Sequence, residues 1–442
     1  MLDYLLEYKL SVCYNSIIVK KIETGDNVMV FTYEKMWQLV AEKGMNKTQF
    51  RDFCSITSAT LSRLSKNENV SLDIIDRICT CLNCNIGDIM DHKSFDSKGN
   101  PETGLKFIDL FAGIGGFRLA GEMNNMSCVF SSEIDKFACE VYKTNFGDVP
   151  SGDITKIEAD EIPDFDVLFA GFPCQPFSYA GQLQGFEDKT RGTLFFDIVR
   201  ILKKKRPKMF LLENVKGLKS HDKGRTMNII LEQLEGLGYD IHWSILNSLD
   251  FGVPQSRERW YCVGFLEKTE FEFPVPLKER VSIKDIIDEK ENFNKSLKLS
   301  DFEISRINHH FEVCPITERN QIRVEHDNSK YAPSTKKGKY GIYSFLKKDK
   351  SLRFHVGDHA KTQIQEAYYC NLDSYSPSII AARAPKLWDL KRHLSDRECA
   401  RLQGFPEDFI LSSSSAQAKK QLGNSVTVPV IFEIVQKMLS TI

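Results

Sequence analysis

Between about residues 105 and 271 the chain alternates between short apolar runs and amphipathic stretches. Five of the apolar runs read as strands: LKFIDLF, SCVFSSE, FDVLFAG, KMFLLEN and DIHWSIL. Helix candidates lie between them at residues 117–124, 135–145, 192–204 and 227–237. Strands that are spaced by helices in this way predict an α/β fold with a doubly wound sheet.

The chain on either side of this region has a different texture. Residues 34–91 read as short helices, and the polar stretch HKSFDSKGNPETG that follows is typical of a linker. After about Phe271 the alternation fails, and an irregular, charged and aromatic region runs to about Leu390. Residues 428–439 form an amphipathic helix, which needs a partner surface.

Composition suggests an intracellular protein but does not identify a partner. The twelve cysteines are scattered over 442 residues, as expected for reduced thiols. No apolar run approaches the ~20 residues that cross a bilayer, and the N-terminal residues are too acidic and polar for a signal peptide. We therefore expect a cytoplasmic protein without a membrane partner. The net charge of −1 is uninformative, but residues 43–66 and 330–361 carry a local positive excess that fits either nucleic acid or a solvated face.

A glycine turn marks a candidate ligand site at one end of the sheet. In FIDLFAGIGGF a strand runs into Gly113 and then into a helix, so the backbone can approach a ligand closely. Glu133 ends the second strand, twenty residues further on, where an acidic side chain can take the hydroxyls of a ribose. Gly152-Asp153-Ile154 adds to this pattern. The residues favour a nucleoside ligand, although many α/β proteins turn on glycine without one.

Cys174 stands between two prolines, directly after the FDVLFA strand. A cysteine at the carboxyl edge of an open sheet is held at the usual ligand crevice and could act as a nucleophile. The alternative is an inert structural cysteine, which is the commoner fate of a single cysteine.

Eight blocks carry a family resemblance from Leu105 onward. They are DLFAGIGGFR, SSEID, GDI, GFPCQPFS, LLENVKG, GVPQSRERWY, LSDRECARLQGFP and LGNSVTVPV. In this order they resemble the cytosine-C5 DNA methyltransferases of bacterial restriction-modification systems. The resemblance implies the S-adenosylmethionine-dependent methyltransferase fold, with S-adenosyl-L-methionine as cofactor, duplex DNA as substrate, no metal, and a monomer in catalysis.

The resemblance also implies a role for each reacting group. The Cys174 thiolate would attack C6 of cytosine, so that C5 becomes nucleophilic and accepts the methyl group. A free thiol has a pKa near ~8.5, and Arg257 and Arg259 would supply the positive charge that favours the thiolate and would hold O2 of the base. Glu213 would donate a proton to N3 or share one with it. No side chain is assigned as the base that removes the proton from C5.

The cofactor and the target base make further demands on the chain. By resemblance the cofactor pocket is lined by Phe111, Ala112, Gly113, Gly115, Gly116, Glu133, Ile134, Asp153, Ile154, Pro173, Leu194, Asn424 and Val426. Because C5 is inaccessible in stacked DNA, the base must be flipped out, and residues 178–191 would close over it, unless they are a plain surface loop. Residues 105–270 would be the catalytic domain and 271–410 a smaller, irregular target-recognition domain. Residues 411–442 would return to the catalytic domain.

Residues 33–91 resemble a helix-turn-helix of the phage-repressor type, flanked by an unassigned segment, 1–32, and the linker, 92–104. The turn would be Cys54-Ser55-Ile56, with Ser55 where glycine is frequent. The predicted DNA contacts are Lys47, Gln49, Ser58, Thr60 and Arg63. The unit would bind an operator as a dimer and regulate transcription, assist substrate binding, or serve only in packing. Cys81 and Cys84 are expected to be ordinary thiols.

Two rival functions share most of these features. A tRNA cytosine-C5 methyltransferase of the same fold would carry most of the blocks, but Phe172 before Pro173 and a helix-turn-helix suit the DNA enzymes better. A DNA-binding regulator with an inactive methylase domain is the other alternative. The presence of Cys174, Glu213 and both arginines argues against such decay.

Overall fold

The computed structural model describes residues 31–65, 70–92, 104–173, 194–277, 280–315, 322–326, 341–357, 365–380 and 384–442. The chain divides between residues 103 and 104 into two compact units, and each is described by itself. In the described residues no helix is long and apolar enough to cross a membrane.

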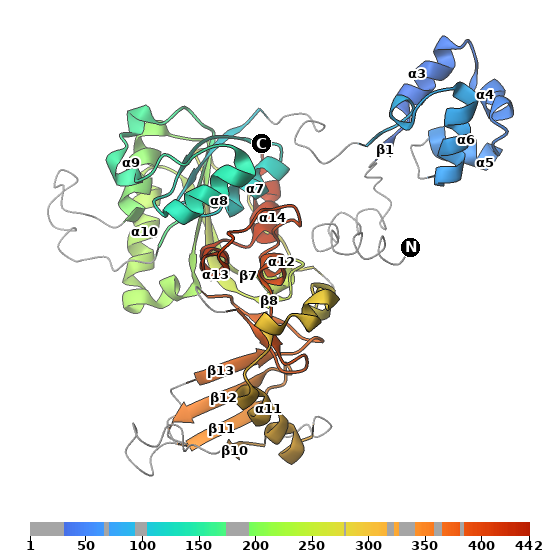
Figure 1. Ribbon diagram of the computed structural model, residues 1–442. Coiled ribbons are helices and arrows are strands. Elements are labelled where there is room, and N and C mark those ends of the chain that lie inside the picture. Colours follow the sequence, from blue (N-terminus) through green and yellow to red (C-terminus); the bar gives the residue numbers. More distant parts are fainter. Residues whose placement is uncertain are drawn as a thin grey trace. The chain divides into compact units, whose positions relative to one another are not determined.

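The unit that precedes residue 104 is built from short helices, as the pattern predicts (Figure 1). They are α3 (Glu34–Glu42), α4 (Lys47–Phe53), α5 (Ser58–Ser65) and α6 (Leu72–Leu82), and strand β1 (Phe31–Thr32) pairs antiparallel with β2 (Asp91–His92). The apolar faces of the helices meet in one core, where Met36, Phe50, Leu64 and Ile78 are fully buried.

The turn between α4 and α5 lies where the helix-turn-helix resemblance predicts it. The Asn46 side chain accepts a hydrogen bond from the Gln49 amide, the Gln49 side chain accepts one from the Asn46 amide, and this capping box fixes the start of α4. Helix α4 ends at Phe53 with Cys54 as its C-cap, and Ser55 has a φ of 49°, in the left-handed region that favours glycine. Ile56 then returns the chain to the core.

A six-stranded sheet forms the core of the second unit. Its strands lie in the order β4 (Ser127–Ser132), β3 (Lys106–Leu110), β5 (Val167–Gly171), β6 (Met209–Val215), β9 (Glu258–Phe265) and β7 (Asp240–Asn247). The first four are parallel, and β9 is antiparallel to both of its neighbours. The five predicted strands are all present. The additional strand, β9, lies in the GVPQSRERWY block and directly after it.

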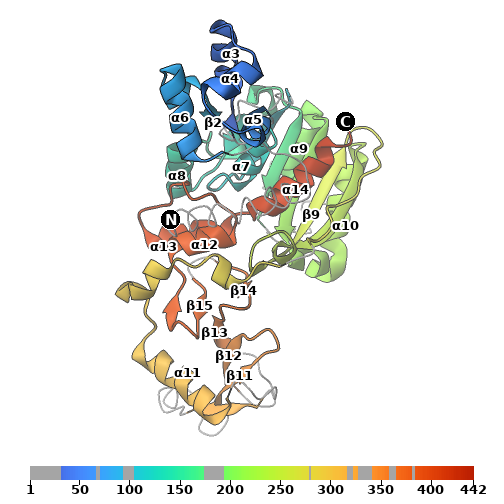
Figure 2. The same cartoon turned by 90° about the vertical axis from the view of Figure 1, so that its right-hand side faces the viewer.

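Helices cover both faces of this sheet, so the predicted doubly wound fold is confirmed. One face packs against α7 (Gly116–Met123), α8 (Lys136–Phe146), α12 (Asp396–Leu402), α13 (Ser415–Asn424) and α14 (Val428–Leu439). The other face packs against α9 (Leu194–Lys205) and α10 (Arg225–Gly236) (Figures 1 and 2). Alternation along β3 explains this arrangement, because Phe107 belongs to the first core and Ile108 to the second.

A second sheet lies within the region that the pattern describes as irregular. Its order is β10 (Val324–His326), β11 (Gly341–Leu346), β12 (Leu352–Gly357), β13 (Gln365–Cys370), β15 (Lys386–Leu387) and β16 (Arg392–His393). A further pair joins β8 (Gln255–Ser256) to β14 (Ser376–Pro377). Hydrophobic alternation fails on β11 because both faces carry large side chains: Ile342 is buried on one, and Tyr343 stacks on His355 on the other.

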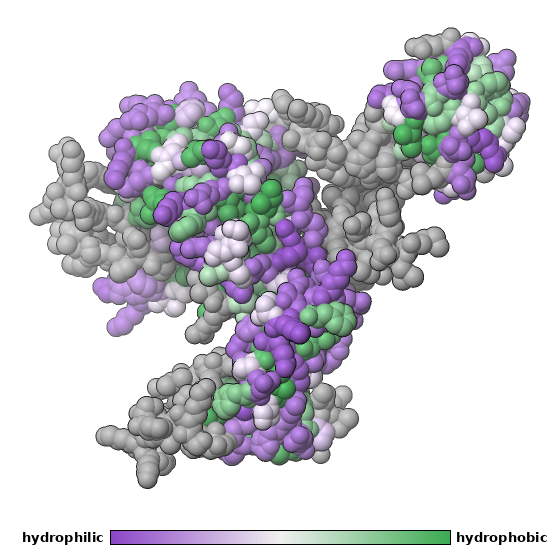
Figure 3. All heavy atoms as spheres, viewed as in Figure 1, coloured by the Kyte–Doolittle hydropathy of each residue, from purple (hydrophilic) through white to green (hydrophobic). Residues whose placement is uncertain are grey.

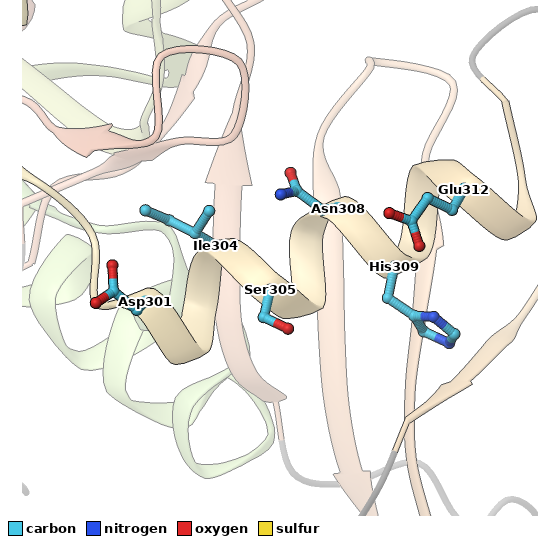
Figure 4. Close-up of a pocket in the computed structure, with 6 residues that line it drawn as sticks. All are labelled: Asp301, Ile304, Ser305, Asn308, His309 and Glu312. Atoms are coloured by element: carbon cyan, nitrogen blue, oxygen red, sulfur yellow. The ribbon is translucent and has the colours of Figure 1, made fainter.

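Helix α11 (Asp301–Val313) packs on the second sheet through a small core that includes Ile307, Leu352 and Phe354. In contrast, Phe271, Ile283 and Leu394 belong to the core of the first sheet. A hollow on α11 is lined by Asp301, Ile304, Ser305, Asn308, His309 and Glu312 (Figure 4), and the surface over this helix is mostly hydrophilic (Figure 3). No residue of the predicted active site lines this hollow. Short 3-10 helices complete the described chain at Ile86–Asp88, Ile154–Lys156, Ala159–Glu161, Lys216–Gly224, Ser248–Asp250, Ile283–Asp285, Glu289–Phe293 and Lys295–Leu297.

The left-handed Ser55 generates a stability prediction. Ser55→Gly should stabilise the α4–α5 region by about 0.5–1 kcal/mol, because relief of a strain of ~1–2 kcal/mol exceeds the entropic cost of glycine. Amide hydrogen exchange of α4 and α5 in the full-length protein measures this. Ser62→Gly, the same change inside α5, should instead destabilise by about 0.5 kcal/mol. Equal signs for the two variants would contradict the assignment of the turn.

Candidate active site

The glycine turn after β3 brings the backbone to an open surface. Phe111, Gly113 and Gly115 have φ angles of 58°, 56° and 92°. A Cβ on Gly113 would meet no described atom within 4 Å, whereas one on Gly115 would lie 2.3 Å from the Phe146 ring. A Cβ on Gly116 would lie 2.8 Å from Ser425 Oγ and from Val426 Cγ2. The turn therefore needs glycine for packing on one side and leaves Gly113 accessible to a ligand on the other.

Glu133 is fixed beside this turn by main-chain amides. Its Oε2 accepts the Gly113 amide, and its Oε1 accepts the amides of Ile134 and Asp135, all at 2.8 Å. A carboxylate oxygen offers about two acceptor sites, so Oε2 keeps one for a ribose hydroxyl, whereas Oε1 already accepts two amides. The neighbouring Ile134 side chain is 74% exposed, although it is apolar. A held carboxylate, an exposed apolar side chain and an open glycine fit the nucleoside part of S-adenosyl-L-methionine.

The other predicted cofactor residues fall on both sides of the sheet. Ala112 and Val426 are buried next to the turn, and Asn424 is exposed. On the other side, Ile154, Phe172 and Phe195 share one apolar cluster, so their chain neighbours Asp153, Pro173 and Leu194 come from one region. Asp153 caps the short helix at Ile154 by accepting the Thr155 amide at 3.1 Å, Pro173 is exposed, and Leu194 begins α9. No described hydrogen bond joins the two groups of residues.

Glu213 and Arg259 form an ion pair, in which Glu213 is buried and Arg259 is partly exposed. Arg259 Nε lies 3.1 Å from Glu213 Oε1, and these residues come from the adjacent antiparallel strands β6 and β9. Burial raises the pKa of Glu213, although Arg259 and Arg257 oppose the shift. On its other side, β6 pairs with β5, and Glu213 is in register with Gly171. The carboxyl group therefore lies at the strand end that leads to Cys174, and it holds a proton more readily than an exposed Glu does.

Cys174 itself, and the predicted closing loop at 178–191, lie outside the described residues. Phe172 is anchored directly after β5, since Asn214 Nδ2 donates to the Phe172 carbonyl at 2.9 Å, while Asn214 Oδ1 accepts the Val215 amide. Asn214 is 2% exposed. Sequence reasoning missed this residue, although it stands next to Glu213 in the LLENVKG block.

The two predicted catalytic arginines have different surroundings. Arg259 contacts Glu213, as described above. Arg257 is 3% exposed, and its guanidinium donates to the main-chain carbonyls of Ile379, Gly423 and Ser425. The structure thus brings Arg259 to the predicted proton donor and directs Arg257 toward the C-terminal segment.

Comparison with known proteins identifies the family. Residues 105–440 match the model of the C-5 cytosine-specific DNA methylases. The chain belongs to this family. The methylase is 44% identical over 345 residues to "Type II methyltransferase M1.ScrFI" of Lactococcus lactis subsp. cremoris, which covers 76% of this chain and 78% of the relative. It is 39% identical over 338 residues to "Type II methyltransferase M.HhaI" of Haemophilus parahaemolyticus, covering 76% of this chain and 94% of the relative.

Solved structures agree on the fold. The S. pombe Dnmt2 methyltransferase superposes with a TM-score of 0.53 at 20% sequence identity, over 76% of this methylase and 99% of that chain. Residues 35–94 separately match a Cro/C1-type helix-turn-helix DNA-binding domain. Within the described part of the methylase no group of His, Cys, Asp or Glu side chains could hold a metal ion.

The predicted DNA contacts of the helix-turn-helix lie in two environments. Lys47 is exposed, with Nζ 3.1 Å from Ser65 Oγ and 4.6 Å from the centre of the Trp37 ring. Arg63 is exposed on α5. Gln49 belongs to the capping box, Ser58 accepts a hydrogen bond from Arg51, and Thr60 bonds to Thr57. In their present rotamers the last three side chains therefore serve the domain itself.

The raised pKa of Glu213 predicts a pH dependence for the stability of the methylase. The folded protein holds this proton more tightly than the unfolded chain, whose pKa is about 4.3. The stabilising contribution is therefore complete below that value and is lost as the pH rises through the higher folded pKa. Thermal unfolding of the native protein and of Glu213→Gln between pH 4 and 8 measures it. The native protein should lose stability relative to the variant as pH rises, and a gain would contradict the shift.

The Asn214 hydrogen bond predicts a kinetic effect. Asn214→Ala frees the Phe172 carbonyl, so that the strand end before Cys174 is misplaced, and kcat should fall by roughly 10–100-fold with cofactor affinity unchanged. Steady-state methylation assays and cofactor titration separate these two quantities. Asn124→Ala is the matched control, because buried Asn124 donates similar bonds to the carbonyls of Ala120 and Phe432. A kcat loss of the same size in both variants would refute the specific role.

Proposed function

We propose that this methylase transfers the methyl group of S-adenosyl-L-methionine to C5 of a cytosine that is flipped out of a specific duplex DNA sequence. We further propose that it is the modification enzyme of a bacterial Type II restriction-modification system, as the names of its relatives suggest. The observation that carries the chemical proposal is the ion pair of the buried Glu213 with Arg259, at the strand end that precedes Cys174.

The chemistry of cytosine explains why these groups are needed together. The Cys174 thiolate attacks C6 and forms a C–S bond, while Glu213 gives a proton to N3 and so limits the negative charge on the ring. Arg259 holds the Glu213 carboxylate and supplies positive charge at O2. The attack at C6 makes C5 nucleophilic, and C5 then accepts the methyl group. Loss of the C5 proton to solvent or another base then expels the thiolate, and the proton on N3 returns to Glu213.

The residues around the glycine turn suit the cofactor. Glu133 would bind the ribose hydroxyls, Ile134 would contact the adenine face, and Asp153 would bind the exocyclic amine. Bound there, S-adenosyl-L-methionine supplies an electrophilic methyl group on its sulfonium. Asn424 and Val426 would line its methionine end. The second sheet, with α11, would read the DNA sequence, since its basic and aromatic residues suit phosphate and base contacts.

A covalent trap tests this mechanism. Cys174→Ser should abolish methyl transfer but retain DNA binding, because the thiolate starts the reaction and is not needed to hold the duplex. Duplex DNA with 5-fluorocytosine at the target should form a covalent adduct with the native protein, since fluorine does not leave C5 as a proton. Electrophoresis under denaturing conditions detects the adduct. Its absence on DNA that the protein methylates would refute the mechanism, and methylation of tRNA alone would favour the tRNA enzyme.

The helix-turn-helix supports a second function. We propose that it binds an operator near the methylase's own gene, as a dimer on two-fold-related half-sites about one helical turn apart. The match of residues 35–94 to a Cro/C1-type DNA-binding domain supports this, as does the separate compact unit. The methylase part already has a region proposed to recognise the DNA sequence, residues 271–410. Catalysis therefore needs no second sequence-recognising domain.

Deletion of residues 1–95 tests the regulatory proposal. The shortened protein should keep its methylation specificity, whereas operator binding should be lost. In the intact protein that binding should weaken steeply with salt, as phosphate contacts by Lys47 and Arg63 require. Footprinting and methylation mapping measure the two properties separately. Lost methylation specificity, without any footprint from the intact protein, would show that the unit serves the catalytic substrate instead.

A further inference from the structure

We propose that Arg257 is a positioning residue that holds the C-terminal segment 423–426 as a wall of the cofactor pocket, while Arg259 alone faces the target base. This inference rests on the proposed function and goes beyond it. The sequence gives both arginines the same role, which is to favour the thiolate by their positive charge and to hold O2 of the base. The structure assigns them different roles.

The two terminal nitrogens of the Arg257 guanidinium hold mainly main-chain carbonyls. Nη1 donates to Ser378 Oγ at 3.2 Å, to the Ile379 carbonyl at 3.1 Å and to the Gly423 carbonyl at 3.2 Å. Nη2 donates to the carbonyls of Gly423 at 3.2 Å and Ser425 at 2.7 Å. The planar fork reaches all these acceptors at once, and a lysine ammonium could not. The backbone of Arg257 is also fixed, because its amide donates to Asn247 Oδ1.

The carbonyls that Arg257 binds end a helix. Helix α13 finishes at Asn424, with Ser425 as its C-cap, so the Gly423 carbonyl lacks a partner within the helix. A cation at this end also interacts favourably with the helix dipole. Gly423 and Ser425 flank Asn424, whose own side chain is exposed. Arg257 therefore fixes the backbone on both sides of a residue that is proposed to meet the cofactor.

The fixed segment presses on the glycine turn. Ser425 Oγ and Val426 Cγ2 lie so close to Gly116 that an added Cβ would be 2.8 Å from each. Gly116 begins α7, three residues after Gly113, whose amide is bound by Glu133. A shift of the segment would therefore be transmitted to the turn that holds Glu133, the carboxylate that is proposed to bind the ribose. Arg259 is different, because its partners in the described structure are Glu213, the proposed proton donor to the base, and the Glu258 carbonyl.

Cofactor binding distinguishes the two arginines. Arg257→Lys should raise the dissociation constant for S-adenosylhomocysteine, measured by calorimetry well below the unfolding temperature, by about 10–100-fold. The KM for S-adenosylmethionine should rise in parallel with little change in kcat. Arg259→Lys should do the opposite: kcat falls and cofactor affinity stays within about twofold. Ser378→Ala, which removes one partner of Nη1, should weaken cofactor binding by about 2–5-fold.

Arg401→Lys is the matched control for loss of a buried arginine. Arg401 is 5% exposed and donates to the Ile286 carbonyl at 2.8 Å while it binds Glu407. The Arg401→Lys variant should be less stable than the native protein, but its affinity for S-adenosylhomocysteine should be unchanged. Native affinity in Arg257→Lys, or an equal loss in Arg401→Lys, would overturn the inference. If Arg257→Lys does not fold, Ser378→Ala decides, and native affinity there overturns it. A native protein that binds no S-adenosylhomocysteine would instead refute the proposed function itself.

Discussion

Two arginines and one carboxylate share the buried space where β6 and β9 run side by side, and the site depends on how this charge is compensated. Glu213 balances only one of the arginines directly. Burial, together with the charge of Arg259, lowers the pKa of Arg257 to about 10, which shows how unfavourable a second buried cation is here. Carbonyl dipoles from α13 and from Ile379 offset the remaining charge. The same contacts therefore compensate the charge beside Glu213 and fix the position of the C-terminal segment.

Supporting hydrogen bonds extend this arrangement without further charges. Gln403 donates to the carbonyls of Leu422 and Ser425, and it accepts from Thr427 and from Gln255. Gln255 also accepts the Ile379 amide. The segment that presses on Gly116 is thus held by neutral amides as well as by a guanidinium. Since these groups are buried, each lost bond leaves a polar atom without water to replace its partner.

Sequence reasoning succeeded where burial is simple. Parallel strands such as β3 and β5 are buried on both faces, so they read as apolar runs, and α14 was predicted with its observed bounds because one stripe of it is apolar. The second sheet was missed because its strands mix aromatic, histidine and arginine side chains on one face, as in the stack of Tyr343 on His355. The pairing of the glycine turn with Glu133 follows from a spacing along the chain, whereas the contacts of Arg257 and Asn214 join residues far apart in sequence. No local pattern encodes such contacts.

The hydrogen bond from Asn124 to the Phe432 carbonyl spans 308 residues and has a consequence for the order in which the protein matures. Helix α14 packs on α7, so the core that begins at β3 is completed only after the ribosome has passed residue 439. The helix-turn-helix unit contains its own core and needs nothing beyond about residue 92. At ~5–20 residues per second, a nascent chain would carry a folded DNA-binding unit for roughly 20–70 s before the methylase core can close. Each newly made molecule is thus a DNA-binding protein first and a DNA-modifying enzyme second.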